Sequence, residues 1–462
     1  MFLDPENLQR VPPSEILKEA TAGRLGIDQR FFRALLNRRE ETLAALLDWA
    51  KRDREDDPVN LEIEAVELIH AFRAPEGMPF LLDAIRIAPD EIPDEVIEAI
   101  HSFGSEAVEP LLDLYKELGE EDGAEVAFLL ASLHVRDRRI LELLLDRLEY
   151  DVAEGAFLLG VYGDPQTRPA LEKMAASLDE GEKDLKREVE NAIGLLNEES
   201  TRAEDKPFDL LGRYPEKAAP PMDLLSESAR IEFLEHPCGS VRAEAAHSFF
   251  NKAIDSTVSA KLLNLAKSDP EVAVRSRAWE SLSEATERPE VLKAMLAAMR
   301  DSSLPAQERA SVLVGLSLEA DRNEVRAAME ELYEHREARA KALEAMWRSV
   351  HPSFRERFVP NLDDDDMEVR RSAIWGIGYF GIRSSLDRLR GFFGEEELRP
   401  DALFAYALAI PGETTKGRMR TLFNRIAKDA GGLSTLEEEL VKVALDERLA
   451  LAGKDAYFAT QN

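Results

Sequence analysis

The feature that most constrains this fold is a short phrase of residues that returns at nearly regular intervals. Val241-Arg242, Val274-Arg275 and Val369-Arg370 each open a phrase that has alanine four residues after the valine. The first two phrases begin 33 residues apart, and the third begins 95 residues after the second, about three periods of roughly 32 residues. Weaker copies at Glu308-Arg309 and Ala338-Arg339 fall inside that interval. A period of this length predicts stacked two-helix units, each of which contacts only its neighbours.

The first half of the chain carries a second version of this period. Residues 65–72 align with residues 96–103 at a shift of 31, and residues 126–133 follow 30 positions later. Weaker copies near 156–159 and 191–196 suggest about five units before residue 200. Apolar residues recur at helical spacing in these segments and between them, which predicts pairs of amphipathic helices.

Four prolines within residues 207–221 break the rhythm, because proline removes a backbone donor and disfavours helix in the residue before it. Phe208 and Tyr214 lie among these prolines, so we expect the segment to pack on the array. The predicted parts of the chain are N-terminal capping helices (1–58), an acidic N-terminal arm (59–200), a proline-rich connector (201–225), a C-terminal arm (226–452) and a frayed tail (453–462).

Two of the phrases resemble HEAT repeats. Residues 269–278 and 364–373 are similar to the turn and second helix of such a repeat. In that family an Asp in the turn and an Arg six residues later contribute to a ladder along the stack. The spacing is kept by Asp269 with Arg275 and by Asp364 with Arg370.

The phrase at Val241 departs from the family pattern, because His236-Pro237 stand where the Asp would be. A turn Asp can accept backbone N–H groups at a helix start and can pair with the Arg of a neighbouring unit. The resemblance implies a right-handed superhelix of antiparallel helix pairs whose second helices line a concave face. We therefore expect an all-α fold, an α-solenoid of about ten HEAT-like helix pairs in two arms. Such a fold serves many roles and does not by itself specify a function.

Negative charge is concentrated in the first arm. The chain has a net charge of −32, and residues 51–200 hold 38 Asp and Glu against 15 Lys and Arg, a balance of −23. Charge of this sign repels phosphate backbones, so nucleic acid is an unlikely ligand for this arm. Two interpretations remain. The charge can serve solubility, or part of it can line a groove for a protein partner with a basic surface.

Several classes of protein are disfavoured by what the sequence lacks. Cys238 is the only cysteine, so no internal disulfide is possible and a reducing compartment is favoured. No stretch approaches 18 uninterrupted apolar residues, and residues 1–6 do not read as the start of a signal peptide. No phosphate-binding loop, dinucleotide fingerprint or nucleophile elbow occurs. We therefore expect a cytoplasmic protein with no membrane contact and no cofactor.

Two pairs with Glu-x-x-His spacing, Glu67 with His70 and Glu98 with His101, occupy equivalent positions of successive units. This spacing supplies ligands in di-iron bundles, because residues three apart share a helix face. No companion carboxylates stand out, so we favour a repeated surface pair over a metal site. The run of aspartates at 363–366 is interpreted as a turn that caps the following helix.

Tryptophans at three positions of the second arm, Trp279, Trp347 and Trp375, do not share one repeat position, so we predict no aromatic ladder. The function that we favour is a non-enzymatic scaffold or adaptor that presents a concave, partly acidic surface to a protein partner. The alternative is an enzyme or lyase on the same frame, acting on a protein or a protein-bound cofactor. Nucleic-acid binding through the more balanced second arm is a third, less favoured interpretation of the protein's function. The sequence leaves the oligomeric state open. The residues that we predict to contact a partner are Glu67, His70, Glu98, His101, Trp375 and Tyr379.

Overall fold

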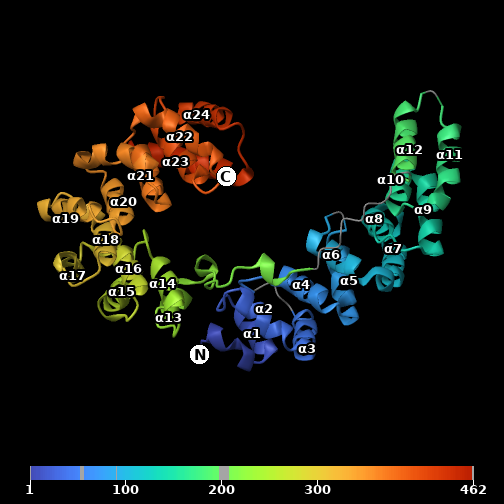
Figure 1. Ribbon diagram of the computed structural model, residues 1–462, viewed down its shortest axis with the longest axis horizontal. Coiled ribbons are helices and arrows are strands. Elements are labelled where there is room, and N and C mark those ends of the chain that lie inside the picture. Colours follow the sequence, from blue (N-terminus) through green and yellow to red (C-terminus); the bar gives the residue numbers. More distant parts are fainter. Residues whose placement is uncertain (1, 53–56, 90, 180, 197–207, 460–462) are drawn as a thin grey trace. The chain divides into compact units, whose positions relative to one another are not determined.

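The computed structural model describes residues 2–52, 57–89, 91–179, 181–196 and 208–459. Within these ranges the chain is all-α and contains no strand, and neighbouring helices pack one after another (Figure 1). This arrangement is consistent with the predicted helical array. The chain divides into two compact units, Met1–Leu225 (unit 1) and Ser226–Asn462 (unit 2). The first residues of the predicted connector, 201–207, lie outside the described ranges, as do residues 460–462 of the predicted tail.

Unit 1 contains twelve α-helices in its described part. Helices α4, α6, α8, α10 and α12 form one row in which each contacts the next, and α5, α7, α9 and α11 alternate with them along the chain. We call the members of this row second helices. The helices of unit 1 are α1 (Pro13–Thr21), α2 (Gln29–Leu36), α3 (Arg39–Trp49), α4 (Glu62–Phe72), α5 (Met78–Ile87), α6 (Asp94–Phe103), α7 (Val108–Asp122), α8 (Ala124–Ser132), α9 (Arg138–Tyr150), α10 (Val152–Tyr162), α11 (Arg168–Ser177) and α12 (Lys183–Leu195).

Unit 2 repeats this plan with a longer row of second helices. Helix α14 contacts α16, and contacts continue in order through α18, α20, α21, α23 and α25. Figure 1 shows α14, α16, α18 and α20 as one row with α15, α17 and α19 beside it. The helices of unit 2 are α13 (Glu227–Phe233), α14 (Gly239–His247), α15 (Ser256–Ser268), α16 (Val272–Ser281), α17 (Pro289–Arg300), α18 (Ala306–Gly315), α19 (Asn323–Tyr333), α20 (Arg339–Ser349), α21 (Met367–Tyr379), α22 (Leu386–Gly391), α23 (Arg399–Ala409), α24 (Lys416–Asp429) and α25 (Thr435–Leu451).

Local sequence fixes where many of these helices begin. Asp255 accepts the backbone N–H of Val258 at the start of α15, and Ser434 forms a capping box with Glu437 at the start of α25. Asp366 caps α21 by accepting the N–H of Glu368 at 2.9 Å. The interpretation of the aspartate run as a helix cap is therefore confirmed.

The arginine of the phrase at Val241 joins its own unit to the next one. The Nη1 of Arg242 donates to the main-chain oxygens of His236 and Pro237 at 2.8 and 2.9 Å. Its Nε and Nη2 donate to the carboxylate of Asp269 at 2.8 and 3.0 Å. The unit that lacks a turn Asp therefore still makes the ladder contact, because its arginine pairs with the Asp of the following turn.

The same two-sided contact recurs along unit 2. Arg275 donates to the main-chain oxygen of Asp269, six residues earlier, and pairs with Glu308 of α18 at 2.7 Å. The six-residue spacing thus reflects a bond from arginine to a backbone carbonyl, whereas the carboxylate comes from the next unit. Equivalent bonds link Arg339 to the oxygen of Tyr333 and to Asp364, and Arg399 to the oxygen of Phe393 and to Glu437.

Small residues let the second helices approach closely. Gly378 of α21 faces α23, where a Cβ at this position would lie 2.7 Å from the Cα of Ala405. No ordinary side chain tolerates that distance, so this crossing requires glycine. Among the residues described here, no helix is both long and apolar enough to cross a bilayer.

Candidate partner-binding surfaces

The Glu67 carboxylate in unit 1 is hydrogen-bonded to the connector. Glu67 lies on α4 and is only 3% exposed. It accepts the hydroxyl of Tyr214, and it accepts Nη1 of Arg213 at 3.1 Å. Burial, and then the hydrogen bond to Glu67, raises the pKa of the Tyr214 phenol. A carboxylate placed in this way anchors the connector on the row of second helices, and its predicted contact with a partner stays a prediction.

Arg213 bridges two successive second helices. Its Nη2 donates to Glu98 of α6, which remains exposed on its other side. The guanidinium also lies over the ring of Phe208, 4.9 Å from its centroid. The equivalent acidic positions of two units are therefore brought together around one arginine from the chain itself.

The two predicted histidines have different surroundings. His70 stacks on Phe208 of the connector with ring centroids 3.8 Å apart. Burial is the main reason that the pKa of His70 falls below its ordinary value, so the ring is neutral near pH 7. His101 is exposed and lies 2.8 Å from the hydroxyl of Ser132 on the next second helix. Among the described residues no group of three or more His, Cys, Asp or Glu could hold a metal ion.

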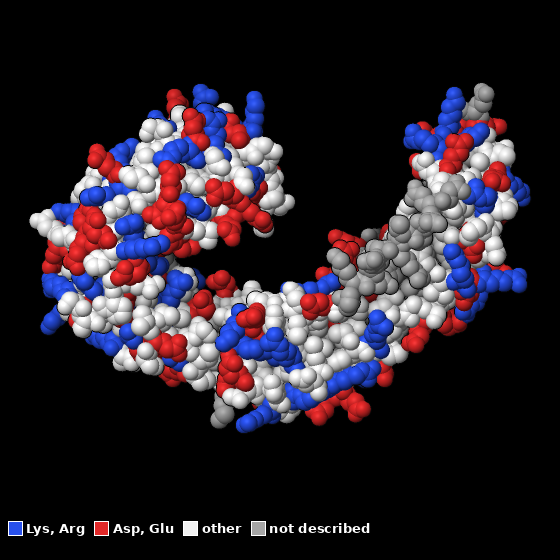
Figure 2. All heavy atoms as spheres, viewed as in Figure 1, with Lys and Arg blue, Asp and Glu red and all other residues white. Residues whose placement is uncertain are grey.

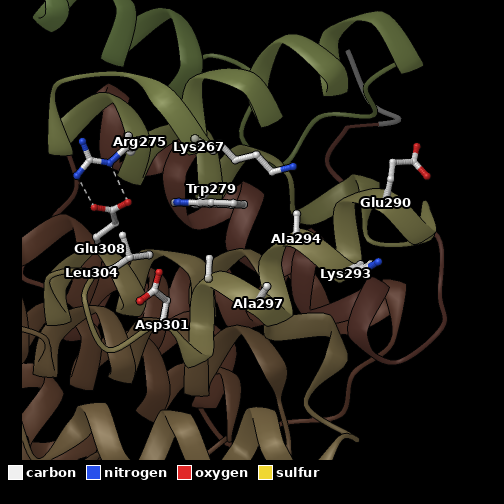
Figure 3. A pocket seen from close by; sticks show the side chains of 12 residues that line it. Lys267, Arg275, Trp279, Glu290, Lys293, Ala294, Ala297, Asp301, Leu304 and Glu308 are labelled. Carbon is white, nitrogen blue, oxygen red and sulfur yellow. Dashed lines mark hydrogen bonds and ion pairs between the residues drawn. The ribbon is translucent and has the colours of Figure 1, made fainter.

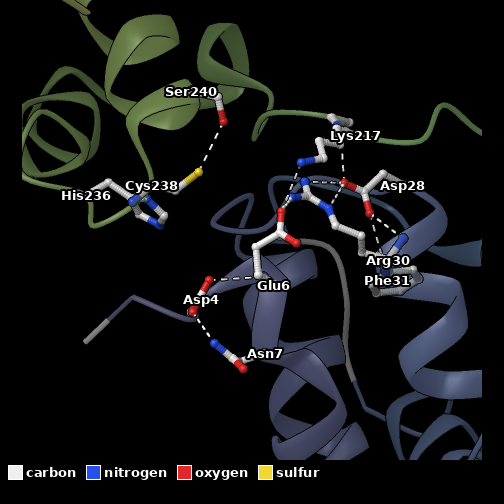
Figure 4. Close-up of polar contacts among 11 residues, drawn as sticks. Asp4, Glu6, Asn7, Asp28, Arg30, Phe31, Lys217, His236, Cys238 and Ser240 are labelled. Atoms are coloured by element: carbon white, nitrogen blue, oxygen red, sulfur yellow. Dashed lines mark hydrogen bonds and ion pairs between the residues drawn. The ribbon is translucent and has the colours of Figure 1, made fainter. Parts of the chain in front are cut away.

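The rest of the connector is bound at the N-terminal end of unit 1 (Figure 4). Asp28, which caps α2, also accepts the backbone N–H of Ala218 at 2.9 Å and the guanidinium of Arg30. Lys217 pairs with Glu6 at 3.2 Å. Residues 208–225 are therefore an integral part of unit 1 and not a loose tether.

An aromatic pair that the sequence analysis did not single out lies further along unit 1. Phe128 of α8 and Phe157 of α10 stack with parallel rings at a centroid distance of 6.2 Å. With Glu125 and Glu154 they line a hollow of about 290 Å³. The signal was present in the sequence, because Phe128 follows Glu98 by 30 residues and so stands at the equivalent repeat position.

In unit 2 the two predicted aromatic residues belong to a larger cluster. Trp347 of α20 stacks on Trp375 at 5.3 Å and on Tyr379 at 5.0 Å, both on α21. Two of the three tryptophans therefore stack although they do not share one repeat position, a contact that the sequence did not predict. Trp347 lies eight residues after Arg339 and Trp375 five after Arg370, yet the crossing of α20 and α21 brings the staggered rings together.

Hydrogen bonds fix the orientation of these rings. The indole N–H of Trp375 donates to Asp401 of α23 at 2.7 Å, and the hydroxyl of Tyr379 donates to Glu447 of α25 at 3.3 Å. Burial, followed by the charge of Glu447, raises the pKa of Tyr379 to about 12. Trp375 and Tyr379 are both partly exposed, so they present preoriented aromatic edges at the surface.

An arginine is held between two aromatic rings beside this cluster. The guanidinium of Arg348 lies 4.4 Å from the ring centroid of Phe250 and 4.6 Å from that of Trp347. It donates to Asn251 at 3.3 Å and to Glu344 at 2.9 Å. Residues 97 positions apart, at the ends of α14 and α20, therefore meet within unit 2.

A buried charge network connects second helices of unit 2. The carboxylate of Glu280, on α16, is 1% exposed. It accepts the hydroxyl of Ser311 on α18 and the ammonium of Lys341 on α20, each at 2.8 Å. It also accepts Nη1 of Arg277 at 3.2 Å. One carboxylate thus links three successive second helices.

The network continues from Lys341 to Glu344 at 2.8 Å. Burial alone would lower the pKa of Lys341, but the carboxylates of Glu280 and Glu344 outweigh it, so the pKa is raised. Burial alone would raise the pKa of Glu344, but Lys341 and Arg348 outweigh it and lower the pKa. Both groups are therefore charged at neutral pH, and each stabilises the charged form of the other.

A separate hollow of about 550 Å³ lies among α15, α16, α17 and α18. Figure 3 shows the edge of Trp279 above the alanines of α17, with the Arg275–Glu308 pair closing one end. Trp279 is only 2% exposed, so little of its ring is offered to a ligand. The charged side chains at its rim carry both signs: Lys267, Lys293, Glu290 and Asp301.

Charges of both signs are interspersed over unit 2 (Figure 2). This agrees with the near balance of acidic and basic residues after position 200 in the sequence. No family model matches this sequence, and no curated protein does.

Proposed function

We propose that this protein is a non-enzymatic scaffold or adaptor that binds a protein partner through its rows of second helices. The observation that carries the proposal is the aromatic cluster of Trp347, Trp375 and Tyr379. The rings of Trp375 and Tyr379 are oriented by hydrogen bonds to α23 and α25, and both remain partly exposed. Aromatic side chains fixed in this way are the residues that most often dominate protein–protein binding, because little conformational entropy is lost when they are covered.

Two finer features of the fold belong to the same proposal. The helix pairs are HEAT-like, and the rows wind as a right-handed superhelix that brings the second helices onto a concave face. The arginine contacts support the first feature, because each arginine bonds its own turn and a carboxylate of the following unit. We also propose that the protein acts in the cytoplasm, where its single cysteine would remain reduced.

The proposed partner carries a basic surface. The acidic excess of residues 51–200 supports this assignment, as does the binding of Arg213 by Glu67 and Glu98. That contact is intramolecular, and it illustrates a chemistry that the second helices of unit 1 accept: a guanidinium bound by two carboxylates. Glu98 and His101 remain exposed and can contribute to such a surface.

The proposal is tested by capture followed by reconstitution. The full chain is immobilised, proteins from a native lysate are bound at low salt, and each candidate is then purified and titrated against the free chain. We expect a direct complex whose dissociation constant rises as salt is increased, since exposed charges are screened. Trp375→Ala should weaken that complex at least tenfold, because hot-spot aromatic residues contribute about 2 kcal/mol or more.

Leu436→Ser is the matched control, because Leu436 is 84% exposed on α25 and is not among the residues that form the aromatic cluster. This variant should bind the partner as the unchanged chain does. The proposal is wrong if no purified protein binds directly, or if Trp375→Ala and Leu436→Ser have the same effect on every complex found.

A further inference from the structure

The ends of six helices in unit 2 converge on one hollow. It is lined by residues at or just after the C-terminal ends of α14, α16, α18, α20, α21 and α25. Its volume is about 230 Å³. This is smaller than the roughly 300–1,000 Å³ of sites for drug-sized ligands, and it suits one side chain of a larger partner.

Exposed apolar side chains gather at this hollow. Leu318, Val350 and Leu451 line it and are 62%, 42% and 52% exposed. They are three of the six large apolar side chains that are exposed in the described part of unit 2. Phe250 and Tyr379 form further parts of the wall. A cluster of this kind is unusual on a free surface and marks a contact site for another molecule.

The backbone at Val350 supports a role beyond packing. Val350 ends α20 in the left-handed region, with φ 50° and ψ 18°. A β-branched residue is strained there, and glycine or asparagine would be favoured. The strained conformation places an apolar side chain in the lining of the hollow, where 42% of it remains exposed.

The electrostatics of the hollow favour a cation next to the apolar group. Glu284 and Glu447 line it, and six helices present their C-terminal ends, which carry partial negative charge. Arg348 is the basic residue in the lining. Its guanidinium is already bonded to Glu344 and Asn251 and lies between two rings, so part of its charge is compensated.

We propose that this hollow is a docking pocket for a short protein segment in which an aliphatic side chain is followed closely by lysine or arginine. The aliphatic side chain contacts Leu318, Val350 and Leu451, and the cation lies toward Glu284 and Glu447. The assignment rests on the scaffold function and specifies one of its binding sites. A lining that combines exposed apolar side chains with two carboxylates fits this pairing of groups.

The test uses a random seven-residue peptide library displayed on phage and selected against the full chain. Enriched sequences are synthesised with a fluorescent label, and their affinity is measured by anisotropy. We expect enrichment of Leu, Ile or Met with Lys or Arg within two positions. Replacing the aliphatic residue of such a peptide by Ser, or its basic residue by Glu, should weaken binding at least tenfold.

Substitutions in the chain test whether the peptide binds in this pocket. Leu318→Ser should weaken binding at least tenfold. Val350→Gly should also weaken it, and it should raise the melting temperature because glycine adopts the left-handed conformation without strain. Loss of binding in a variant that is more stable cannot be a consequence of misfolding. Leu436→Ser is again the control and should leave the peptide affinity unchanged.

Each other outcome overturns the assignment. Selection of acidic peptides, or of none, contradicts the proposed chemistry of the pocket. A concentration-dependent dimer that Leu318→Ser dissociates would make a second copy of this chain the occupant. If peptides bind but respond to Trp375→Ala and not to Leu318→Ser or Val350→Gly, the scaffold function stands and the pocket does not. If the capture experiment also yields no direct complex, both proposals fail.

Discussion

The Glu280 carboxylate offers a sharp test of how the second helices of unit 2 are joined. Replacing Glu280 by Ala removes the acceptor for Ser311 and Lys341, both at 2.8 Å, and for Arg277 at 3.2 Å. Breaking a buried ion pair by removing one partner costs about 3–5 kcal/mol. The lower end applies here, because Lys341 keeps Glu344 and Arg277 is partly exposed. We expect a loss of about 3 kcal/mol.

Urea unfolding, monitored by tryptophan fluorescence, reports this loss of stability mainly from unit 2. Of the four tryptophans, three lie in unit 2. With a slope of about 3 kcal/mol per molar urea, 3 kcal/mol lowers the unfolding midpoint of unit 2 by about 1 M. Lys341→Met gives the second single variant of a double-mutant cycle, and a coupling energy of about 0.5–3 kcal/mol is expected for residues in one network.

Two results would refute the reasoning about Glu280. A midpoint that moves by less than about 0.3 M would mean that the carboxylate contributes no more than an ordinary surface charge. Additive effects of Glu280→Ala and Lys341→Met would mean that the two groups do not interact. Glu280→Gln is the matched control, because it keeps the volume and the acceptor for Ser311, and it should cost less than the alanine variant.

Three further predictions concern unit 2 and its packing. The pKa of Glu344 is depressed in the folded protein, so this carboxylate stabilises the fold above about pH 4.5. The stabilisation is lost as pH falls through the folded pKa. Glu344→Gln should therefore reduce the loss of stability in acid, measured as urea midpoints over a range of pH. Tyr379→Phe should remove one phenol that ionises near pH 12, as followed by phenolate absorbance, while an ordinary tyrosine ionises near 10. Gly378→Ala should destabilise by about 1–3 kcal/mol in urea because its Cβ would meet Ala405, whereas Gly194→Ala, with open space around it, should not destabilise.

The periodic phrases were sufficient to predict an all-helical array, because each phrase opens a second helix. Val241, Val274 and Val369 lie within the first residues of α14, α16 and α21. The spacing of Asp269 and Arg275 did not reveal why it is six residues. The bond runs to a main-chain oxygen, and a carbonyl leaves no signature in the identity of its residue.

The candidate surfaces were harder to predict, because they depend on how helices cross. The sequence identified Trp375 and Tyr379 as contact residues, but not Trp347 or Phe250. Phe250 lies about three units before Trp347 in the sequence and meets the cluster through Arg348. In unit 1 the acidic positions were identified, but their contact with the connector was not. Arg213 lies 146 residues from Glu67, and no local pattern indicates such a pairing.

The arginine bonds give the array a polarity from one end to the other. Each arginine depends on a carboxylate supplied by the unit that follows it, so removing a unit from the C-terminal side strands a cation in the unit that remains. Removal from the N-terminal side leaves a carboxylate without its arginine, as at the buried Asp269 without Arg242. The pairing of Arg399 with Glu437 of α25 is the last of these contacts along the described part of unit 2. Trimming unit 2 from either end should therefore reduce its stability, because each cut leaves one charge of a pair without its partner.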